Sequence, residues 1–173
     1  KWRNQKVRKI ENWEELRNDI DEVVSFDNIT AGQYICKIID VEDVDSKEYL
    51  KIWFDIVKGD FVDAFKTQEE RTGQWPAQGI MYWSYKASAQ RFYASKITAI
   101  EKSNDGYKYK LFEENQLKGK YFVANFGEEE YLDSDNELKV GLKVQEVRSF
   151  QALKEGKIKT PKRKELSLEA KKQ

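Results

Sequence analysis

Two aromatic side chains and a lysine alternate along a segment that has the pattern of a β-strand. In residues 48–58, one face of the strand carries Leu50, Ile52, Phe54 and Ile56, which we expect to be buried. Tyr49, Lys51 and Trp53 share the opposite face. Aromatic rings can stack nucleobases, at roughly 1–3 kcal/mol per base, and a lysine can neutralise a phosphate. The alternative is that an N-terminal helix or a neighbouring subunit covers this face.

Three further candidate nucleic-acid-binding residues follow in the next predicted strand, residues 61–70, and in the loop after it. Lys66 and Arg71 could contact phosphates. Trp75 stands in a glycine-flanked loop, where it could either stack a base or fix the loop as a buried side chain. The neighbouring cluster of Met81, Tyr82 and Trp83 is predicted to pack in the core or against the helix that follows.

Lysines on other predicted strands could extend a basic track. Lys37 points away from the apolar face of a strand at residues 33–41, and Lys139 and Lys143 point outward from a strand at residues 138–147. In that last strand the predicted inward residues are Leu138, Val140, Leu142 and Val144. Exposed lysines are also common on strands without a ligand, where they discourage edge-to-edge pairing.

The residue types disfavour catalysis. The chain has no histidine and a single cysteine, Cys36, so His-based nucleophile pairs, Cys/His metal sites and intramolecular disulfides are excluded. Residues 40–45 and 128–137 are acidic, but they read as solvated turns rather than a Mg²⁺ site. The run from Asp133 lacks the glycine that a calcium loop needs at its sixth position, where Leu138 stands. We therefore expect no enzymatic activity, no cofactor and no metal.

Composition indicates a soluble chain with enough apolar material for a core. Among 173 residues, 39% are hydrophobic, 13% aromatic and 36% charged, and 31 basic residues balance 31 acidic ones. Zero net charge neither predicts nor excludes a nucleic-acid partner, because binding depends on a local patch. No apolar run is long enough to span a bilayer. We expect a cytoplasmic protein without membrane contact.

The predicted elements follow the order strand, strand, strand, helix, strand, strand. The helix covers residues 85–102, with Ser84 as its cap, and the fourth strand covers 120–127; a short helix follows at 149–155. This is the order of the OB-fold, a five-stranded, partly open Greek-key barrel with a helix between strands three and four. We divide the chain into an N-terminal arm and short helix (1–30), an OB-fold-like domain (31–156) and a basic C-terminal tail (157–173), which is predicted to be disordered or ordered by a partner.

Within residues 31–157 the chain resembles a family of proteins from bacteriophages and prophages of Gram-positive bacteria, encoded in replication and recombination gene clusters. The resemblance is carried by AGQYICKIIDVED, EYLKIWFDIVKGDF, SYKASAQRFYASKITAIEKSNDGY, LKGKYFVANFGEEEY and VQEVRSFQALKEGK. It implies an OB-type fold and a role in binding single-stranded DNA. The basic tail differs from the acidic tip by which bacterial single-stranded DNA-binding proteins recruit partners.

The expected function is therefore non-catalytic binding of single-stranded DNA, with Lys and Arg on the backbone and aromatic residues stacking the bases. The alternative is a protein-interaction module on the same barrel that binds a phage or host replication or recombination enzyme. Exposed aromatic residues and strand edges are also compatible with a homodimer.

Overall fold

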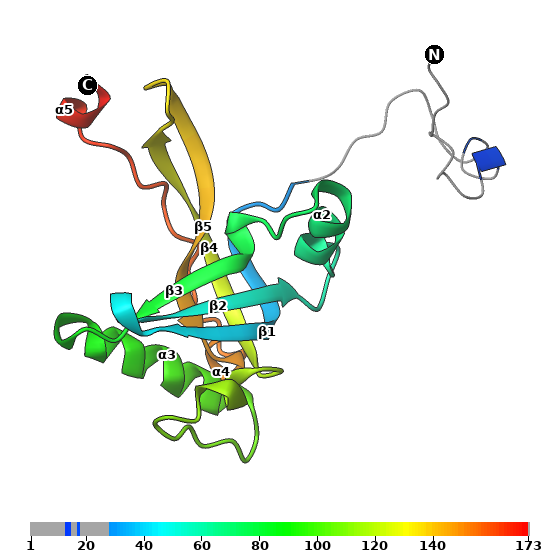
Figure 1. The fold of residues 1–173 in the computed structure, drawn as a ribbon, viewed down its shortest axis with the longest axis vertical. Coiled ribbons are helices and arrows are strands. Elements are labelled where there is room, and N and C mark those ends of the chain that lie inside the picture. Colours follow the sequence, from blue (N-terminus) through cyan, green and yellow to red (C-terminus); the bar gives the residue numbers. More distant parts are fainter. Residues whose placement is uncertain (1–12, 15–16, 18–27, 173) are drawn as a thin grey trace.

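The described part of the chain forms one bent antiparallel sheet with helices against it (Figure 1). The computed structural model describes residues 13, 14, 17 and 28–172. The predicted N-terminal arm and most of the predicted helix after it lie outside the described residues. The strands are β1 (Gly32–Val44), β2 (Tyr49–Ile56), β3 (Ile80–Ser84), β4 (Tyr121–Leu132) and β5 (Leu138–Arg148). The helices are α2 (Ala64–Thr72), α3 (Gln90–Ser103), α4 (Phe150–Lys154) and α5 (Leu168–Lys171).

The five strands lie in the order β3-β2-β1-β4-β5. Neighbouring strands are all antiparallel. The fold is thus an open, mixed α/β sheet, which is consistent with the predicted OB-like class.

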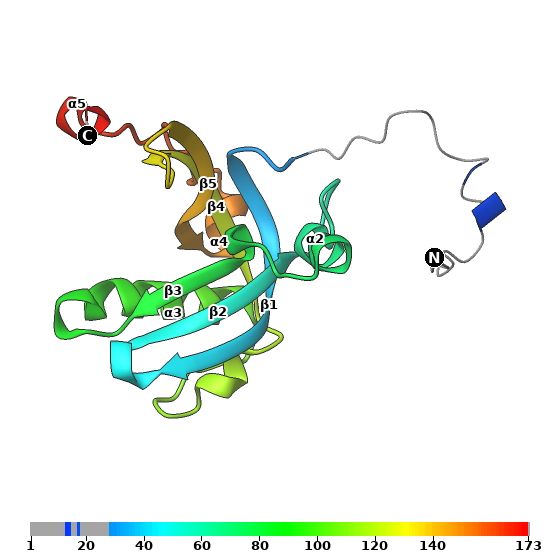
Figure 2. The ribbon, with the colours of Figure 1, turned by 45° about the horizontal axis from the view of Figure 1, so that its top comes forward.

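β1 joins two halves of the sheet. Its residues 32–37 pair with β4 and its residues 36–44 pair with β2. The register with β2 shifts at Ile39, where β1 holds an extra residue. A bulge of this kind bends a strand and increases its twist. Figures 1 and 2 accordingly show β1, β2 and β3 running crosswise to β4 and β5.

The predicted apolar face of β2 is confirmed. Its side chains are at most 1% exposed: Leu50, Ile52, Phe54 and Ile56. The ring of Phe54 meets Phe65 at 5.6 Å and Phe122 at 5.5 Å, both edge-on. Aromatic pairs favour this geometry and gain about 0.5–1.5 kcal/mol beyond their buried area. This packing fixes β2, and with it the side chains on its other face.

The prediction of a third strand at residues 61–70 is wrong. The segment forms a turn and then α2, which buries only Phe65. The third strand is β3, built from the cluster that includes Met81 and Trp83. Lys66 and Arg71, predicted on a strand and its loop, therefore lie on a helix.

α2 forms because a carboxylate on β2 accepts its first backbone N–H groups. Asp55 is 3% exposed; its Oδ1 accepts from Phe65 at 3.0 Å and its Oδ2 from Lys66 at 2.9 Å. The N–H groups in the first turn of a helix have no partner within the helix, and a side-chain acceptor supplies one. Burial raises the pKa of Asp55, and the N–H groups that it accepts oppose that shift. The cap comes from outside the segment, so the local sequence does not reveal the helix.

α3 connects β3 to β4, as predicted. It begins later than expected, at Gln90, because residues 87–89 form a separate 3₁₀ turn. Ser84, the predicted cap, ends β3 instead. Ile97 and Ile100 face the core at 7% and 0% exposure. No helix in the described residues combines the length and the apolar character needed to cross a membrane.

β4 and β5 form a hairpin that projects from the body (Figure 1). We predict a turn from residue 128, but β4 continues to Leu132. The Asp133 carboxylate closes the actual turn by accepting two backbone N–H groups, each at 2.9 Å. Leu138 and Val140, predicted to point inward, are 48% and 45% exposed, because this part of the hairpin extends past the core.

The C-terminal region begins as predicted and then differs. α4 is capped by Ser149, whose Oγ accepts the N–H of Ala152 at 3.1 Å. The tail that follows, predicted to be disordered or ordered by a partner, lies along β4.

Lys164 pairs with the edge of β4 that β1 leaves free. Its N–H donates to the carbonyl of Glu128 at 2.9 Å, and its carbonyl accepts the N–H of Glu130 at 2.8 Å. Arg163 forms an ion pair with Glu128 at 2.6 Å, and Lys171 forms one with Glu130 at 3.0 Å. The acidic residues of β4 therefore hold the basic tail.

Candidate nucleic-acid interface

Lys51 and Trp53 lie together on the face of β2 that points away from the core. The Nζ atom of Lys51 is 4.7 Å from the centre of the Trp53 ring. A cation within about 6 Å of a ring centre is attracted to it. Tyr49 lies on the same face, and all three side chains are half-buried. The predicted group of three is thus assembled, and the described residues leave each of its members accessible in part.

β3 adds Tyr82 to this face, although we predict the cluster of Met81, Tyr82 and Trp83 to pack in the core or against the helix. Met81 and Trp83 are 7% and 1% exposed, but Tyr82 points to the other side and is 55% exposed. It stands opposite Lys51 in the register, and its ring meets Tyr49 edge-on at 5.1 Å. The alternation of side chains along a strand is the signal that separates Tyr82 from its neighbours.

β1 and β4 extend the same face with Lys37 and Tyr121. These residues stand opposite each other in the register, and the Nζ atom of Lys37 is 6.0 Å from the centre of the Tyr121 ring. Lys37 is half-buried and Tyr121 is 39% exposed. Lys37 therefore lies close to the ring of Tyr121. A lysine in this position could contact the phosphate of a nucleotide whose base stacks on that ring.

Two carboxylates lie beside these residues. Asp40 stands opposite Trp53, and Glu42 stands opposite Lys51. Lys118 forms an ion pair with Asp40 at 2.9 Å, and its hydrogen bond holds the pKa of Asp40 below the usual value. Asp40 is thus neutralised by a neighbour, whereas no ion pair to Glu42 occurs within the described residues.

We call this surface the aromatic face. It comprises Lys37, Asp40 and Glu42 of β1, Tyr49, Lys51 and Trp53 of β2, Ile80 and Tyr82 of β3, and Tyr121 of β4.

Three of the predicted site residues lie elsewhere. Lys66 and Arg71 are exposed on α2. Trp75 is half-buried; its Nε1 donates to the carbonyl of Gly79 at 3.0 Å, and its ring lies 6.5 Å from that of Phe65. Trp75 therefore fixes the loop against the core, which is the alternative that the sequence left open.

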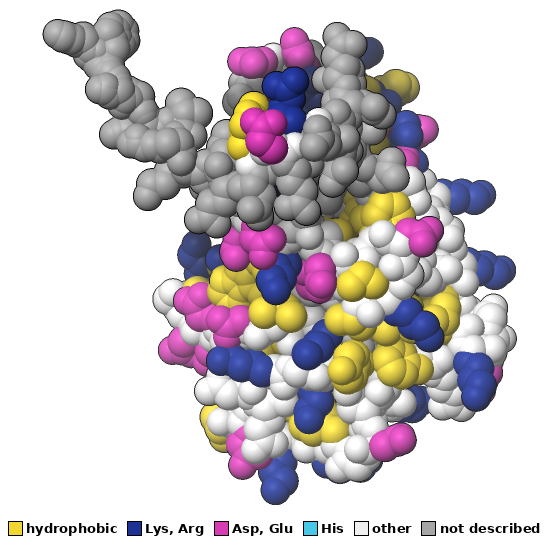
Figure 3. All heavy atoms as spheres, turned by 90° about the vertical axis from the view of Figure 1, so that its right-hand side faces the viewer, with side chains coloured by type: hydrophobic (Ala, Val, Ile, Leu, Met, Phe, Trp, Pro, Cys, Tyr) yellow, Lys and Arg dark blue, Asp and Glu magenta, His cyan; other side chains and the backbone are white. Residues whose placement is uncertain are grey.

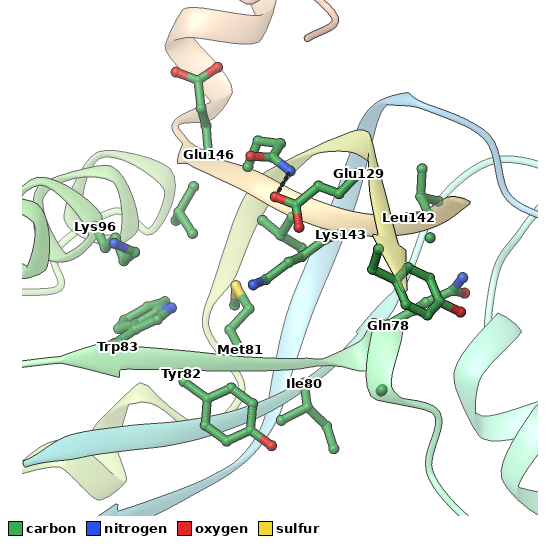
Figure 4. Close-up of a pocket in the computed structure, with 16 residues that line it drawn as sticks. Gln78, Ile80, Met81, Tyr82, Trp83, Lys96, Glu129, Leu142, Lys143 and Glu146 are labelled. Atoms are coloured by element: carbon green, nitrogen blue, oxygen red, sulfur yellow. Dashed lines mark hydrogen bonds between the residues drawn. The ribbon is translucent and has the colours of Figure 1, made fainter. Parts of the chain in front are cut away.

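The two lysines of β5 are also separate from the aromatic face. Lys139 lies near the tip of the hairpin, where it pairs with Glu137 at 3.4 Å and Asp133 at 4.0 Å. Lys143 points into a groove between β3 and β5 (Figure 4). The nine predicted residues thus do not form one continuous track.

The surface charge is mixed on the side of the molecule where α2 lies. Figure 3 shows Lys and Arg side chains scattered among hydrophobic ones there, with acidic side chains gathered toward the left. Any nucleic acid on this side would meet separate cations rather than a continuous basic stripe.

The acidic residues and the cysteine do not form a metal-ligating cluster in the part of the chain that the structure describes. No three metal-ligating side chains come together in residues 28–172 or in the few residues described before them. Cys36 is buried, and burial raises the pKa of its thiol, as expected of a thiol packed as a small hydrophobe.

No protein-family model matches the chain, and no curated protein is found to be similar to it.

Proposed function

We propose that this chain is a non-catalytic single-stranded DNA-binding protein built on an OB-type barrel that is open between β3 and β5. The strand order β3-β2-β1-β4-β5, with α3 between β3 and β4, is that of an OB barrel opened along one seam. OB-folds bind oligonucleotides on strands two and three. Tyr49, Lys51 and Trp53 of the aromatic face lie on β2, and Tyr82 lies on β3.

The observation that carries the proposal is the pairing of Lys51 and Trp53 next to Tyr82 and Tyr49. Two adjacent strands present three partly exposed rings and a cation on one surface. Every base has a π-face, so stacking on such rings holds a single strand without reading its sequence. A duplex keeps its bases stacked inside and offers nothing to these rings.

The charges on this face support moderate rather than strong phosphate binding. Lys37 and Lys51 are the cations beside the rings, while Asp40 and Glu42 repel phosphates. For single strands, log K falls with log salt at a slope of about −0.7 per phosphate contact. With two contacts, we propose a slope of about −1.4.

The biological setting that we propose is the replication or recombination module of a bacteriophage, acting in the cytoplasm of its bacterial host. Support for this setting comes from the resemblance of residues 31–157 to proteins of such modules. Replication and recombination enzymes are then the partners to expect.

The decisive experiment is a comparison of affinities for oligo-dT and for a duplex of equal length over a salt series. Tighter binding of oligo-dT, a shallow salt slope and similar affinities for oligo-dT and oligo-dC support the proposal. Equal affinity for the duplex would overturn it. Absence of binding to oligo-dT at low salt would favour a protein-interaction module.

A further inference from the structure

The seam between β3 and β5 is a groove that borders the aromatic face and shares Ile80 and Tyr82 with it. It encloses about 550 Å³. β3 and β5 are the two end strands of the sheet, and within the described residues no further strand pairs with either of them. Each therefore presents unpaired backbone N–H and C=O groups toward the groove. Unpaired edges are the groups that a polypeptide strand recognises.

Apolar side chains form much of the groove. Met81 and Trp83 point into it from β3, and Val144 and Val147 line it from β5. Figure 4 shows Tyr82 pointing to the opposite side of β3. The groove thus opens onto the inner side of the sheet, where an occupant would bury apolar surface.

One polar atom in the groove wall has no partner. Trp83 is 1% exposed, and its indole Nε1 is buried without an acceptor in the described part of the chain. A buried donor without an acceptor costs about 1–3 kcal/mol. A carbonyl oxygen from an occupant could accept this hydrogen bond.

The lysines of the groove form no close ion pairs, although Lys143 interacts electrostatically with the nearby Glu129 carboxylate. Lys96 from α3 and Lys143 from β5 line it, and neither forms an ion pair with another described residue. Burial lowers the pKa of Lys96, since its ammonium group is partly removed from water. An anionic group placed nearby would stabilise both cations.

The glutamates of the groove, in contrast, are already partnered. Glu129 accepts a hydrogen bond from Gln145 at 2.8 Å, drawn in Figure 4, and pairs with Lys164 at 3.6 Å. Glu146 accepts from Asn125 at 2.8 Å and pairs with Arg148 at 3.1 Å. Because Arg148 and Lys164 already pair with these glutamates, the positive charge of Lys96 remains without an ion-pair partner among the described residues.

We propose that this groove binds an extended acidic–apolar segment of a partner protein, which enters as a strand between β3 and β5. Its backbone pairs with the open strand edges, and one of its carbonyls accepts from Trp83. Apolar side chains pack on Met81 and Val147, while carboxylates approach Lys96 and Lys143. The five residues of β3 set the length of the paired segment. A nucleic acid lacks the alternating N–H and C=O groups that the two edges would pair with.

The test uses the full chain and a fluorescein-labelled hexapeptide of alternating valine and aspartate, read by fluorescence polarisation. Two matched peptides separate the contributions of charge and of backbone pairing. One has lysine in place of aspartate, and the other is N-methylated at alternate residues, so that it cannot donate hydrogen bonds along one of its two edges. We expect binding of the first peptide and at least about ten-fold weaker binding of the other two. Equal binding of the N-methylated peptide, or no binding of the first, overturns the proposal.

Variants locate the site on the protein. Lys96→Glu combined with Lys143→Glu should weaken peptide binding about ten-fold, whereas Lys58→Glu, an exposed lysine in a distant turn, should not. The same variants are titrated with oligo-dT, where we expect affinities within about two-fold of the original chain. If the groove variants lose oligo-dT binding and keep peptide binding, the groove belongs to nucleic acid and the proposal fails.

Discussion

The ammonium group of Lys51 lies 4.7 Å from the centre of the Trp53 ring on the same face of β2. The two residues are separated by one position, so the strand geometry alone places them side by side. The cation lies over the ring, and Trp53 as a whole is half-buried. Adjacent side chains of one β-strand, β2, could therefore bind a base and its phosphate.

Replacing Trp53 should reduce affinity for single-stranded DNA while the protein stays folded. Trp53→Ala removes the ring and should weaken oligo-dT binding by about 5- to 150-fold, which is the loss of one stacked base. Trp53→Phe should recover part of it. Fluorescence anisotropy with labelled oligo-dT measures the affinity, and thermal unfolding monitors the fold. Phe92→Ala is the control, because Phe92 is a 68% exposed aromatic residue on α3; equal losses for both variants would contradict the assignment.

Tyr82 should contribute to binding although the sequence alone predicts that it packs in the core or against the helix. Its ring is 55% exposed and contacts Tyr49 edge-on, so the two rings form one surface. Tyr82→Ala should weaken oligo-dT binding by about 5-fold or more, and Tyr82→Phe should keep the affinity because stacking needs the ring rather than the hydroxyl. An equal loss for Tyr82→Phe would show that hydrogen bonding, and not stacking, is the role of Tyr82.

Alternation and helical spacing predict most of the sheet. β1, β2, β5 and α3 are found near their predicted positions because each carries its own apolar pattern. The third strand is misplaced because the start of α2 depends on Asp55, which lies ten residues before Phe65 in sequence. The tail is missed for a similar reason: its order comes from the paired carboxylates of β4, and no periodic pattern records them.

The sequence predicts the residues at the centre of the candidate site, but it does not predict the residues on neighbouring strands that surround them. Tyr49, Lys51 and Trp53 follow from one strand, so their shared face can be derived from residue numbers. Asp40 and Tyr121 join that face only through the pairing registers of β1, which single-strand patterns do not supply. The sequence alone therefore does not show that the carboxylates of Asp40 and Glu42 lie beside Lys51 and Trp53.

Removing the carboxylate of Asp40 should increase affinity for single-stranded DNA. Asp40 stands opposite Trp53 and holds Lys118 at 2.9 Å. Asp40→Asn removes a negative charge and frees a cation, so oligo-dT should bind about two- to three-fold tighter at low salt, with a steeper salt slope. Titration of oligo-dT at two or more salt concentrations measures both. Asp135→Asn, an exposed residue in the turn between β4 and β5, is the control; unchanged affinity of Asp40→Asn would place the DNA elsewhere.

Asp55 should be essential for the stability of α2. Asp55→Ala leaves the buried N–H group of Phe65 and the partly buried N–H group of Lys66 without this acceptor and should cost about 2 kcal/mol of unfolding free energy. Urea unfolding monitored by circular dichroism measures this loss. Asp63→Asn is the matched control, because Asp63 precedes α2 directly and its side chain makes no capping hydrogen bond. If both variants lose the same stability, Asp55 is not the cap.

Docking of the tail on β4 should weaken in acid. Glu129 receives a hydrogen bond from Gln145 and lies near Lys143 and Lys164, and these contacts hold its pKa below its ordinary value of 4.5. A carboxyl whose pKa is lower in the folded state stabilises that state above its unfolded pKa, and this stabilisation disappears as the pH falls through the folded value. The contribution of Glu129 is therefore complete at neutral pH and is lost below pH 4.5.

Hydrogen exchange tests this titration at the amide of Lys164, which donates to the carbonyl of Glu128. The protection factor, which is corrected for the intrinsic effect of pH, should fall between about pH 5 and pH 3. Glu129→Gln should lower protection at neutral pH and reduce its dependence on pH, because the amide keeps its size but loses the charge that attracts Lys164. Glu113→Gln, in the exposed loop before β4, is the control and should keep the original profile. A pH profile that is unchanged in Glu129→Gln would mean that the backbone bridge, rather than this charge, holds the tail.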